Sequence, residues 1–592
     1  MFQTFEVTAR PEQGPPRLAA LRAEMAAAGV QGFLVPRADA HQGEYVAPRD
    51  ARLAWLTGFT GSAAFCAVLA DVAGVFIDGR YRTQVKAQVA DVYSPVPWPD
   101  VGLAEWLKQH CSGGKIGYDP WLHTVAEVER LRAGLKGTGV EMVQCANLVD
   151  LIWDDQPLPP MAPVKAHPIE FAGQSSADKI AQLAGDLRAA GHDAAVITLP
   201  DSIMWLLNIR GADIARNPVA HGFAVLHGSG RVDLFMDSAK LEGVALDDAA
   251  AVHPANGFLD ALAALEGQVR IDRTTAPQIV GKVLGSRAVF GDEPCALPKA
   301  RKNAAEIAGT EAAHLRDGAA MVEFLTWLDA QAPGSLHETD AVRHLEACRR
   351  KDNALQDISF ETIAGTGPNG AIMHYRVSEE TDSVMQDGHL LVLDSGGQYL
   401  DGTTDITRTI AIGDVGADER AAFTRVLQGM IAMSRLVWPA GLAGRDIEAI
   451  GRVPLWLAGQ DFNHGLGHGV GTYLSVHEGP QRLSKLSHVP FEPGMILSNE
   501  PGYYREGAFG IRIENLLVVE PRVVPGGDPE RSFLGWKTLA YVPIDRRLID
   551  VDRLSGDERE WLNGYHRDVV ERIGPRVGKD AQTWLDAACA AL

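Results

Sequence analysis

The chain has 592 residues, too many for a single hydrophobic core, so three or more domains are expected. Its 46% hydrophobic and 22% charged residues are ordinary for a soluble globular protein. The net charge of −21 argues against a nucleic-acid backbone or an anionic membrane as the main partner.

Six cysteines are scattered along the chain without a CxxC pair, which is too sparse for a disulfide framework or a zinc cage. The N-terminal sequence MFQTFEVTARPEQGPP lacks the basic and apolar regions of a secretory signal. No apolar run of about 18 residues occurs that could span a membrane. These features predict a cytoplasmic protein with reduced thiols.

The first half of the chain contains a weak internal repeat. A helical pattern over 18–28 ends at Gly29 before the apolar strand GFLVP, and a second over 179–190 ends at Gly191 before AAVITLP. Glycine suits both ends because it adopts the left-handed conformation that closes a helix. Each copy then has a Trp-Leu pair and an apolar strand ending in Asp, at Trp55 and Asp78 and at Trp205 and Asp237. The repeat predicts two tandem, related α/β domains, neither with its own cluster of metal-ligand residues.

Two changes in composition suggest domain boundaries. A Pro-rich stretch over 156–168 reads as a linker, and a second shift at 297–303 precedes a long helical pattern. We therefore expect domains at 1–158, 159–303 and 304–592. The third mixes helices such as 417–438 with β-rich segments at 389–412 and 494–519. This mixture predicts an α+β domain whose helices pack on one curved antiparallel sheet.

Four acidic residues occur in two similar settings in this third domain. The strand HLLVLD ends at Asp394, and a short turn leads to the alternating strand TTDITRTIAI, which carries Asp405. A hairpin would bring these two acids together. The layout recurs with Glu500 at a strand end in MILSNEPG and Glu514 within the next strand, GIRIENLLVV. Ordinary surface acids are the alternative, disfavoured because an unpaired charge in an apolar strand is costly.

Histidines gather around the glycine-rich segment HGLGHGVG. Its glycines disfavour a helical metal-binding pair of His464 with His468 and favour a compact loop that packs against a ligand. His477 follows closely, and the segment AIMHYR earlier in the same domain adds His374. Purely structural roles for all four histidines are the weaker alternative.

Together these residues predict a site for two divalent metal ions. Four carboxylates and one imidazole would offer about four negative charges to two divalent cations, so the charges would nearly balance. Two such cations could share a bridging hydroxide, as in metal-assisted hydrolases. The oxygen-rich set favours Mn²⁺, Mg²⁺ or Co²⁺, with Zn²⁺ possible, and we expect Mn²⁺. The predicted ligands are Asp394, Asp405, His468, Glu500 and Glu514.

At these positions the chain resembles a known family. The segments DSGGQYLDGTTDITRT, HGLGHGVGTYLSVHEGP, SNEPGYY and GIRIENLL resemble blocks of the pita-bread metallopeptidases, above all the long, three-domain cytosolic aminopeptidase P group. The resemblance extends to RADAHQGEYVAP, GFTGSAAF and the C-terminal LAYVPIDRRLIDVDRLSGDEREWLNGYH, and so covers most of the chain. It implies two creatinase-like α/β domains followed by a pita-bread catalytic domain.

The resemblance assigns roles to the predicted ligands. Asp394 would chelate one metal ion, and Asp405 and Glu514 would bridge both ions. His468 and Glu500 would complete the second, and Glu500 would also accept the proton of the bridging water.

It also assigns residues to the substrate. His374 and His477 would contact the substrate carbonyl and help stabilise the oxyanion. His464, Tyr504 and Arg512 would line the pocket for proline. For Arg512, an ion pair with a ligand carboxylate is as well supported as direct contact with the substrate. For Tyr504, the alternative to substrate contact is simple packing.

The family also implies a homodimer formed through the C-terminal domain. In the first domain, the segment DGRY offers Arg80 as a contact to a longer substrate across a dimer or domain interface. A structural salt bridge is the favoured alternative for this residue.

The implied activity is removal of the N-terminal residue from peptides with proline at the second position. An X–Pro bond lacks an amide N–H, so a dedicated pocket makes chemical sense. A prolidase restricted to Xaa-Pro dipeptides is the first alternative, disfavoured by the tandem N-terminal domains. A binding or chaperone module that kept the fold without the chemistry is the second, disfavoured by the intact ligand set.

Overall fold

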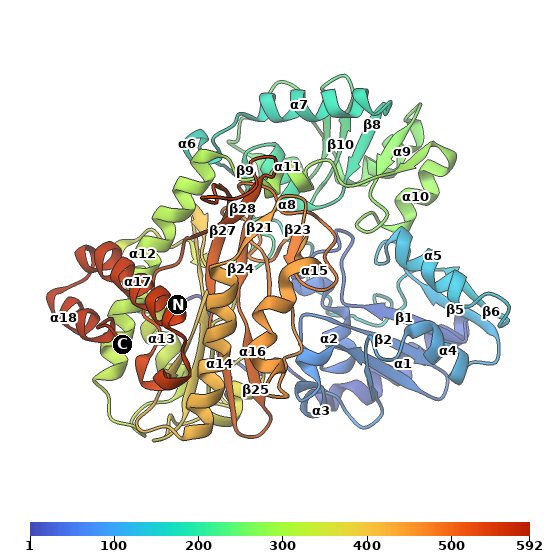
Figure 1. Cartoon of the computed structure of the whole chain (residues 1–592). Helices are drawn as coiled ribbons and strands as arrows, with labels where there is room; N and C mark the ends of the chain where they lie inside the picture. The colour runs from blue at the N-terminus through green and yellow to red at the C-terminus, as the bar shows by residue number, and fades with distance from the viewer. The chain divides into compact units, whose positions relative to one another are not determined.

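The computed structural model describes residues 1–592, which form two compact units. The N-terminal unit comprises Thr8–Lys299, and the C-terminal unit comprises Ala300–Leu592 together with Met1–Val7. Figure 1 labels many of the helices and strands of both units. The first seven residues thus belong with the C-terminal unit, where the Phe2 N–H donates to Glu346 at 2.8 Å.

The N-terminal unit contains two six-stranded sheets with the same topology. The first has the order β4-β3-β2-β1-β5-β6 and the second β12-β11-β10-β8-β13-β14. In each, the first strand of the copy pairs antiparallel with the next strand and parallel with its other neighbour. The two tandem, related α/β domains are therefore confirmed. The strands are β1 (Gly32–Pro36), β2 (Ala64–Leu69), β3 (Ala73–Ile77), β4 (Ser94–Pro97), β5 (Gly114–Tyr118), β6 (Val140–Gln144), β8 (Ala194–Ile197), β10 (Phe223–His227), β11 (Val232–Phe235), β12 (Ala250–His253), β13 (Val269–Ile271) and β14 (Ala288–Phe290).

The helix ends of the repeat follow the glycine signals. Helix α1 (Gly14–Ala27) is followed by Gly29 at φ 68°, and helix α7 (Ser176–Ala189) by Gly191 at φ 74°. Both values are left-handed, which a residue with a Cβ adopts only at a cost. The two Trp-Leu pairs lie in equivalent short helices, α2 (Arg52–Thr57) and α8 (Pro200–Leu206).

The C-terminal unit is an α+β structure in which all strand pairs are antiparallel. Its main sheets have the orders β16-β17-β20 and β21-β28-β27-β24-β22-β23. The strands are β15 (Asp357–Ile358), β16 (Ile363–Thr366), β17 (Leu390–Ser395), β18 (Gly397–Tyr399), β19 (Gly402–Thr403), β20 (Ile406–Ala411), β21 (Val437–Pro439), β22 (Gly467–Gly469), β23 (Glu478–Leu483), β24 (Ile496–Asn499), β25 (Gly502–Arg505), β26 (Phe509–Arg512), β27 (Asn515–Arg522) and β28 (Phe533–Thr538).

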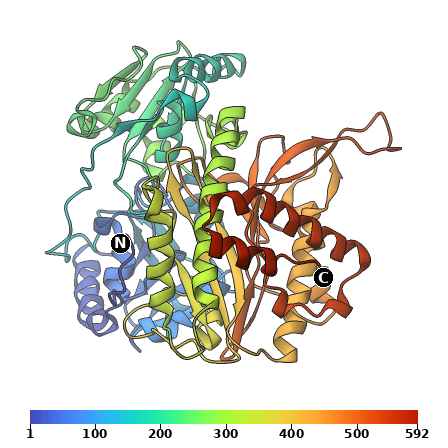
Figure 2. The same cartoon turned by 90° about the vertical axis from the view of Figure 1, so that its left-hand side faces the viewer.

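Long helices cover these strands. The helices are α12 (Ala304–Asp329), α13 (Glu338–Arg349), α14 (Ala417–Ser434), α17 (Gly556–Ile573) and α18 (Lys579–Ala588), and α12 and α13 lie against the strands in Figures 1 and 2. The expected helix over 417–438 was too long. It ends at Ser434 because residues 437–439 pair with β28 as strand β21, which buries the Trp438 side chain.

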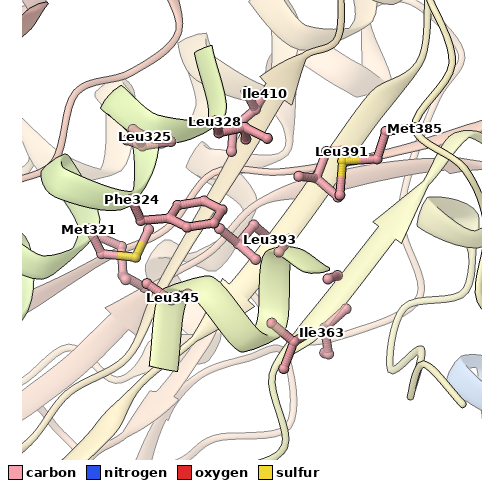
Figure 3. Close-up of a cluster of buried hydrophobic side chains, with 14 of the residues drawn as sticks. Met321, Phe324, Leu325, Leu328, Leu345, Ile363, Met385, Leu391, Leu393 and Ile410 are labelled. Carbon is pink, nitrogen blue, oxygen red and sulfur yellow. The ribbon is translucent and has the colours of Figure 1, made fainter. Parts of the chain in front are cut away.

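The core of the C-terminal unit joins helices α12 and α13 to the strands that carry the acidic residues. Phe324 and Leu328 of α12 and Leu345 of α13 pack against Leu391 and Leu393 of β17 (Figure 3). Asp394 is the next residue of β17. The apolar core therefore fixes one strand of the candidate site from behind.

All six cysteines are free thiols, in line with the expected absence of a disulfide framework. No helix of this structure combines the length and the apolar character needed to cross a lipid bilayer.

Candidate active site

Asp394 and Asp405 lie at the same end of two adjacent strands, although Asp405 precedes its strand rather than lying within it as the sequence predicted. Strand β17 pairs antiparallel with β20, with Asp394 opposite Thr407. Asp405 lies one residue before β20, at the end of the excursion formed by β18 and β19. The acid in β17 and the acid before β20 therefore share one end of the same ladder.

Glu500 and Glu514 lie at a break in a second hairpin. Strand β24 pairs with β27 through Asn499 and Asn515, and β25 pairs with β26 through Gly502 and Arg512. Glu500 follows β24, as expected, but Glu514 falls between β26 and β27 rather than within a strand. Pro501 lacks an N–H, so it cannot continue the ladder at this point. The Glu514 N–H instead donates to the Thr407 carbonyl at 3.1 Å, which joins the two hairpins.

His468 lies in the three-residue strand β22, not in the loop that the glycines suggested. The glycines are needed because neighbouring strands approach closely. A Cβ on Gly467 would lie 1.9 Å from the Ser498 carbonyl oxygen, and one on Gly469 would lie 2.4 Å from that of Glu478. Backbone pairing therefore replaces the loop, and the helical histidine pair is absent as predicted.

The His468 ring is oriented towards the acids. Its Nδ1 lies 2.9 Å from the Gly469 carbonyl oxygen, which can only accept, so the neutral ring carries its proton on Nδ1. The Nε2 atom then faces Asp405 Oδ2 at 3.5 Å and Glu500 Oε1 at 3.7 Å. Ligand atoms of Asp405, His468 and Glu514 all lie within 4.8 Å of one another. A carbonyl that fixes the tautomer in this way is typical of metal-binding histidines.

The buried carboxylates of this cluster need a nearby positive charge. Asp405 and Glu514 are almost fully buried, and the buried Asp394 Oδ1 and Glu514 Oε1 atoms have no hydrogen-bond partner. Burial raises the pKa of Glu514 well above its usual range, and the charges of Asp405 and Asp394 raise it further. Burial also raises the pKa of Glu500, against the pull of His468. This set of unpaired carboxylate oxygens, together with an imidazole nitrogen that faces the acids, fits a pair of divalent cations.

His468 responds to the same charges. Burial lowers the pKa of its imidazole, but the hydrogen bond to Asp405 and the charge of Glu500 outweigh burial and raise that pKa to about 9. Without a cation in the cluster, the neighbouring acids therefore favour the protonated, positively charged form of His468.

Arg512 forms the ion pair that was one of its two predicted roles. Its guanidinium donates to Asp394 Oδ2 at 2.6 Å and to the Tyr504 hydroxyl at 2.7 Å. His464 Nε2 lies 3.0 Å from the same hydroxyl. The three residues expected around proline thus form one connected group that reaches a predicted ligand.

Two residues of the site were missed by the sequence reasoning. The Thr407 hydroxyl donates to Glu514 Oε2 at 2.8 Å and accepts from Arg512 Nε at 3.2 Å. The Ser498 hydroxyl accepts from the His468 N–H at 2.9 Å and donates to Glu500 Oε1 at 3.4 Å. Thr407 is two residues from Asp405, and Ser498 is two from Glu500. The period of two along a strand could therefore have found both.

The remaining predicted residues are placed as follows. The His477 ring stands edge-on to the His468 ring with centroids 4.3 Å apart. His374 follows Met373, whose carbonyl oxygen accepts from Arg512 at 3.3 Å. Arg80 lies in the N-terminal unit, where it pairs with Asp78 at 2.7 Å, the salt bridge that was the favoured alternative.

Comparison with known families divides the chain into four matching regions. Residues 308–521 match metallopeptidase family M24, and residues 532–592 match the C-terminal region of that peptidase. Residues 17–152 and 155–306 each match a creatinase/prolidase N-terminal domain. The tandem repeat thus corresponds to two copies of one known type of domain.

Similar proteins cover nearly the whole chain. A probable Xaa-Pro aminopeptidase P of Coccidioides posadasii is 38% identical over 98% of this chain and 94% of its own. Aminopeptidase P2 of Arabidopsis thaliana is 36% identical over 94% of this chain and 85% of its own. The crystal structure of X-prolyl aminopeptidase from Caenorhabditis elegans, described as a cytosolic enzyme with a di-nuclear active site, has a TM-score of 0.93 at 32% identity and covers 98% of this chain and 100% of its own. The chain therefore belongs to metallopeptidase family M24, among its Xaa-Pro aminopeptidases with two creatinase-type N-terminal domains.

Proposed function

We propose that this protein hydrolyses the bond between the N-terminal residue and a proline in second position of a peptide, using two divalent metal ions. The observation that carries the proposal is the cluster in which ligand atoms of Asp405, His468 and Glu514 lie within 4.8 Å of one another, with Glu500 Oε1 3.7 Å from His468 Nε2. Asp394 and Glu514 each keep a buried oxygen without a hydrogen bond. The full-length similarity to proteins named Xaa-Pro aminopeptidase supports the substrate class.

The proposed ligands are Asp394, Asp405, His468, Glu500 and Glu514. When bound, the two cations would supply the Lewis acidity that lowers the pKa of a water and polarises the scissile carbonyl. The carboxylate-rich donor set favours Mn²⁺ over Co²⁺ or Zn²⁺. Thr407 and Ser498 would hold Glu514 and Glu500 in place through their hydroxyl groups.

The chain's own side chains would divide the remaining work. Glu500 would take the proton of the attacking water and deliver it to the proline nitrogen of the leaving peptide. His374 and His477 would donate hydrogen bonds to the substrate carbonyl as negative charge develops on its oxygen. His464 and Tyr504 would line the proline pocket.

Arg512 would act mainly by holding Asp394 and Tyr504 in place, because its guanidinium already binds both side chains. A homodimer and a cytoplasmic location complete the proposal, the latter supported by the relative from Caenorhabditis elegans that is described as cytosolic.

The test is metal-dependent cleavage of Gly-Pro-Pro and Gly-Pro by the full chain. After chelation and readdition of Mn²⁺, we expect turnover of the tripeptide and loss of it in Glu500→Ala. Hydrolysis of Gly-Pro alone would instead support a dipeptide-specific prolidase.

Glu520→Ala is the matched control, because Glu520 lies on β27 and pairs only with Arg522 in this structure. Near-wild-type turnover in Glu500→Ala would remove Glu500 from the mechanism. Absence of both bound metal and activity would point to a binding module.

A further inference from the structure

A fully buried carboxylate outside the proposed machinery stands at the start of helix α13. Glu338 has 0% of its surface exposed. Its oxygens accept from the Thr366 N–H at 2.7 Å, the Tyr375 hydroxyl at 2.8 Å, the Asn369 amide at 3.1 Å and the Ser383 N–H at 3.1 Å. Every one of these groups donates, so the site is built around an acceptor with several lone pairs. Leaving some of these buried groups without a hydrogen-bond partner would cost considerable free energy.

All four donors belong to one segment, residues 366–383, and that segment carries His374. Tyr375, which binds Glu338 directly, is the residue after His374. The Asn369 amide also donates to the Tyr375 hydroxyl at 3.0 Å, so the two donors hold each other as well as the carboxylate. Glu338 therefore ties both ends of the segment and its middle to helix α13.

The opposite side of the segment rests on the strand that carries Arg512. A Cβ on Gly510 of β26 would lie 1.7 Å from the Gly370 carbonyl oxygen, so the two backbones are in direct contact there. The Met373 carbonyl accepts from Arg512 at 3.3 Å. Both chain neighbours of His374 are thus held, Tyr375 by Glu338 and Met373 by Arg512.

We infer that Glu338 is a positioning residue for the peptidase reaction: it holds segment 366–383 so that His374 meets the substrate carbonyl. This inference rests on the proposed function, in which His374 donates to that carbonyl. A donor that is out of place weakens an interaction made mainly in the transition state, so kcat should fall more than KM rises.

Helix α13 supplies a matched control. Glu346 is also buried and also accepts a backbone N–H, that of Phe2 at 2.8 Å. Its partners are the N-terminal residues Met1 to Gln3 and Arg350, and none of them lies in segment 366–383. Glu346→Gln replaces a buried carboxyl group on the same helix and should leave kcat unchanged.

The experiment is a double-mutant cycle on the full-length, metal-loaded enzyme with Gly-Pro-Pro as substrate. Glu338→Gln should lower kcat on the order of 10- to 100-fold in the wild-type background, with bound metal unchanged. In a His374→Ala background the same substitution should change kcat by no more than about twofold, because the residue through which it acts is already gone. Equal losses in both backgrounds, or no loss in the first, would overturn the inference.

Hydrogen exchange provides a readout that does not depend on activity. Glu338→Gln should speed exchange of the amides in 366–383 by about tenfold, and Glu346→Gln should not. Tyr375→Phe, which removes one donor only, should show the same pattern more weakly if Glu338→Gln does not fold. If wild-type protein leaves Gly-Pro-Pro intact, the proposed function fails. Unchanged exchange in 366–383 would then refute the positioning role separately.

Discussion

Thr407 offers the sharpest test of how this chain holds its proposed metal ligands. Replacing it by Val keeps the shape of the side chain and removes one hydroxyl. That hydroxyl joins Glu514 Oε2 at 2.8 Å to Arg512 Nε at 3.2 Å, and Thr407 is buried. The substitution therefore leaves a buried acceptor and a buried donor each short of one partner.

The size of the effect follows from these two bonds. Leaving a buried polar group unsatisfied costs about 1–3 kcal/mol, so the metal-free protein should lose stability within that range. Losing a hydrogen bond to a ligand carboxylate typically weakens metal binding by about 10- to 100-fold. We therefore expect Thr407→Val to bind Mn²⁺ more weakly by that factor and to need more metal for full activity.

The assay is a titration of metal against a competing chelator, with bound metal measured by elemental analysis. Thr409→Val is the matched control. Thr409 lies two residues along β20 and is also buried, but its hydroxyl bonds the Arg512 backbone, donating at 2.9 Å and accepting at 3.0 Å. It should lose stability while keeping its metal affinity. Wild-type affinity in Thr407→Val, or an equal loss in both variants, would refute this account of Glu514.

Two further predictions test the strand geometry and the buried acid of α13. Gly467→Ala should abolish Xaa-Pro cleavage and lower the melting temperature by several degrees, because its Cβ would lie 1.9 Å from the Ser498 carbonyl oxygen. Gly185→Ala in helix α7 is the control: its new Cβ would approach only the end of the Arg188 side chain, so the variant should be neutral or stabilising. An active, stable Gly467→Ala would show that β22 can shift to make room. Burial raises the pKa of Glu338 from 4.5 to about 7, although its hydrogen bonds with Thr366, Tyr375, Asn369 and Ser383 favour the charged form, so the folded protein holds this proton more tightly than the unfolded chain. Stability from this group is then full below pH 4.5 and is lost as pH rises through 7, by about 3 kcal/mol at most. Thermal denaturation from pH 5 to pH 8 should therefore show wild type losing stability relative to Glu338→Gln, and parallel curves would contradict the raised pKa.

Much of the candidate site could be predicted because its signals are local. The apolar strand that ends at Asp394 and the alternating strand after Asp405 are close in sequence, and a hairpin joins such strands. The glycines around His468 indicated tight backbone contact, although the contact is a strand pair and not a loop. The position of Glu514 between two strands was harder to predict, because the break in the ladder is caused by Pro501, which lies in the neighbouring part of the hairpin.

The sequence by itself determined the repeat, the class of each unit and the chemical type of the proposed metal ligands, because periodicity, helix-ending glycines and residue type are properties of short segments. Only the tertiary structure decided which groups meet across long separations. Phe2 reaches Glu346 across 344 residues, Arg512 reaches Asp394 across 118, and Tyr375 reaches Glu338 across 37. These contacts depend on how helices and strands pack after they form, and no local pattern encodes that packing. The proposed ligands can thus be recognised in short segments, while the side chains that hold them in place are decided by the fold.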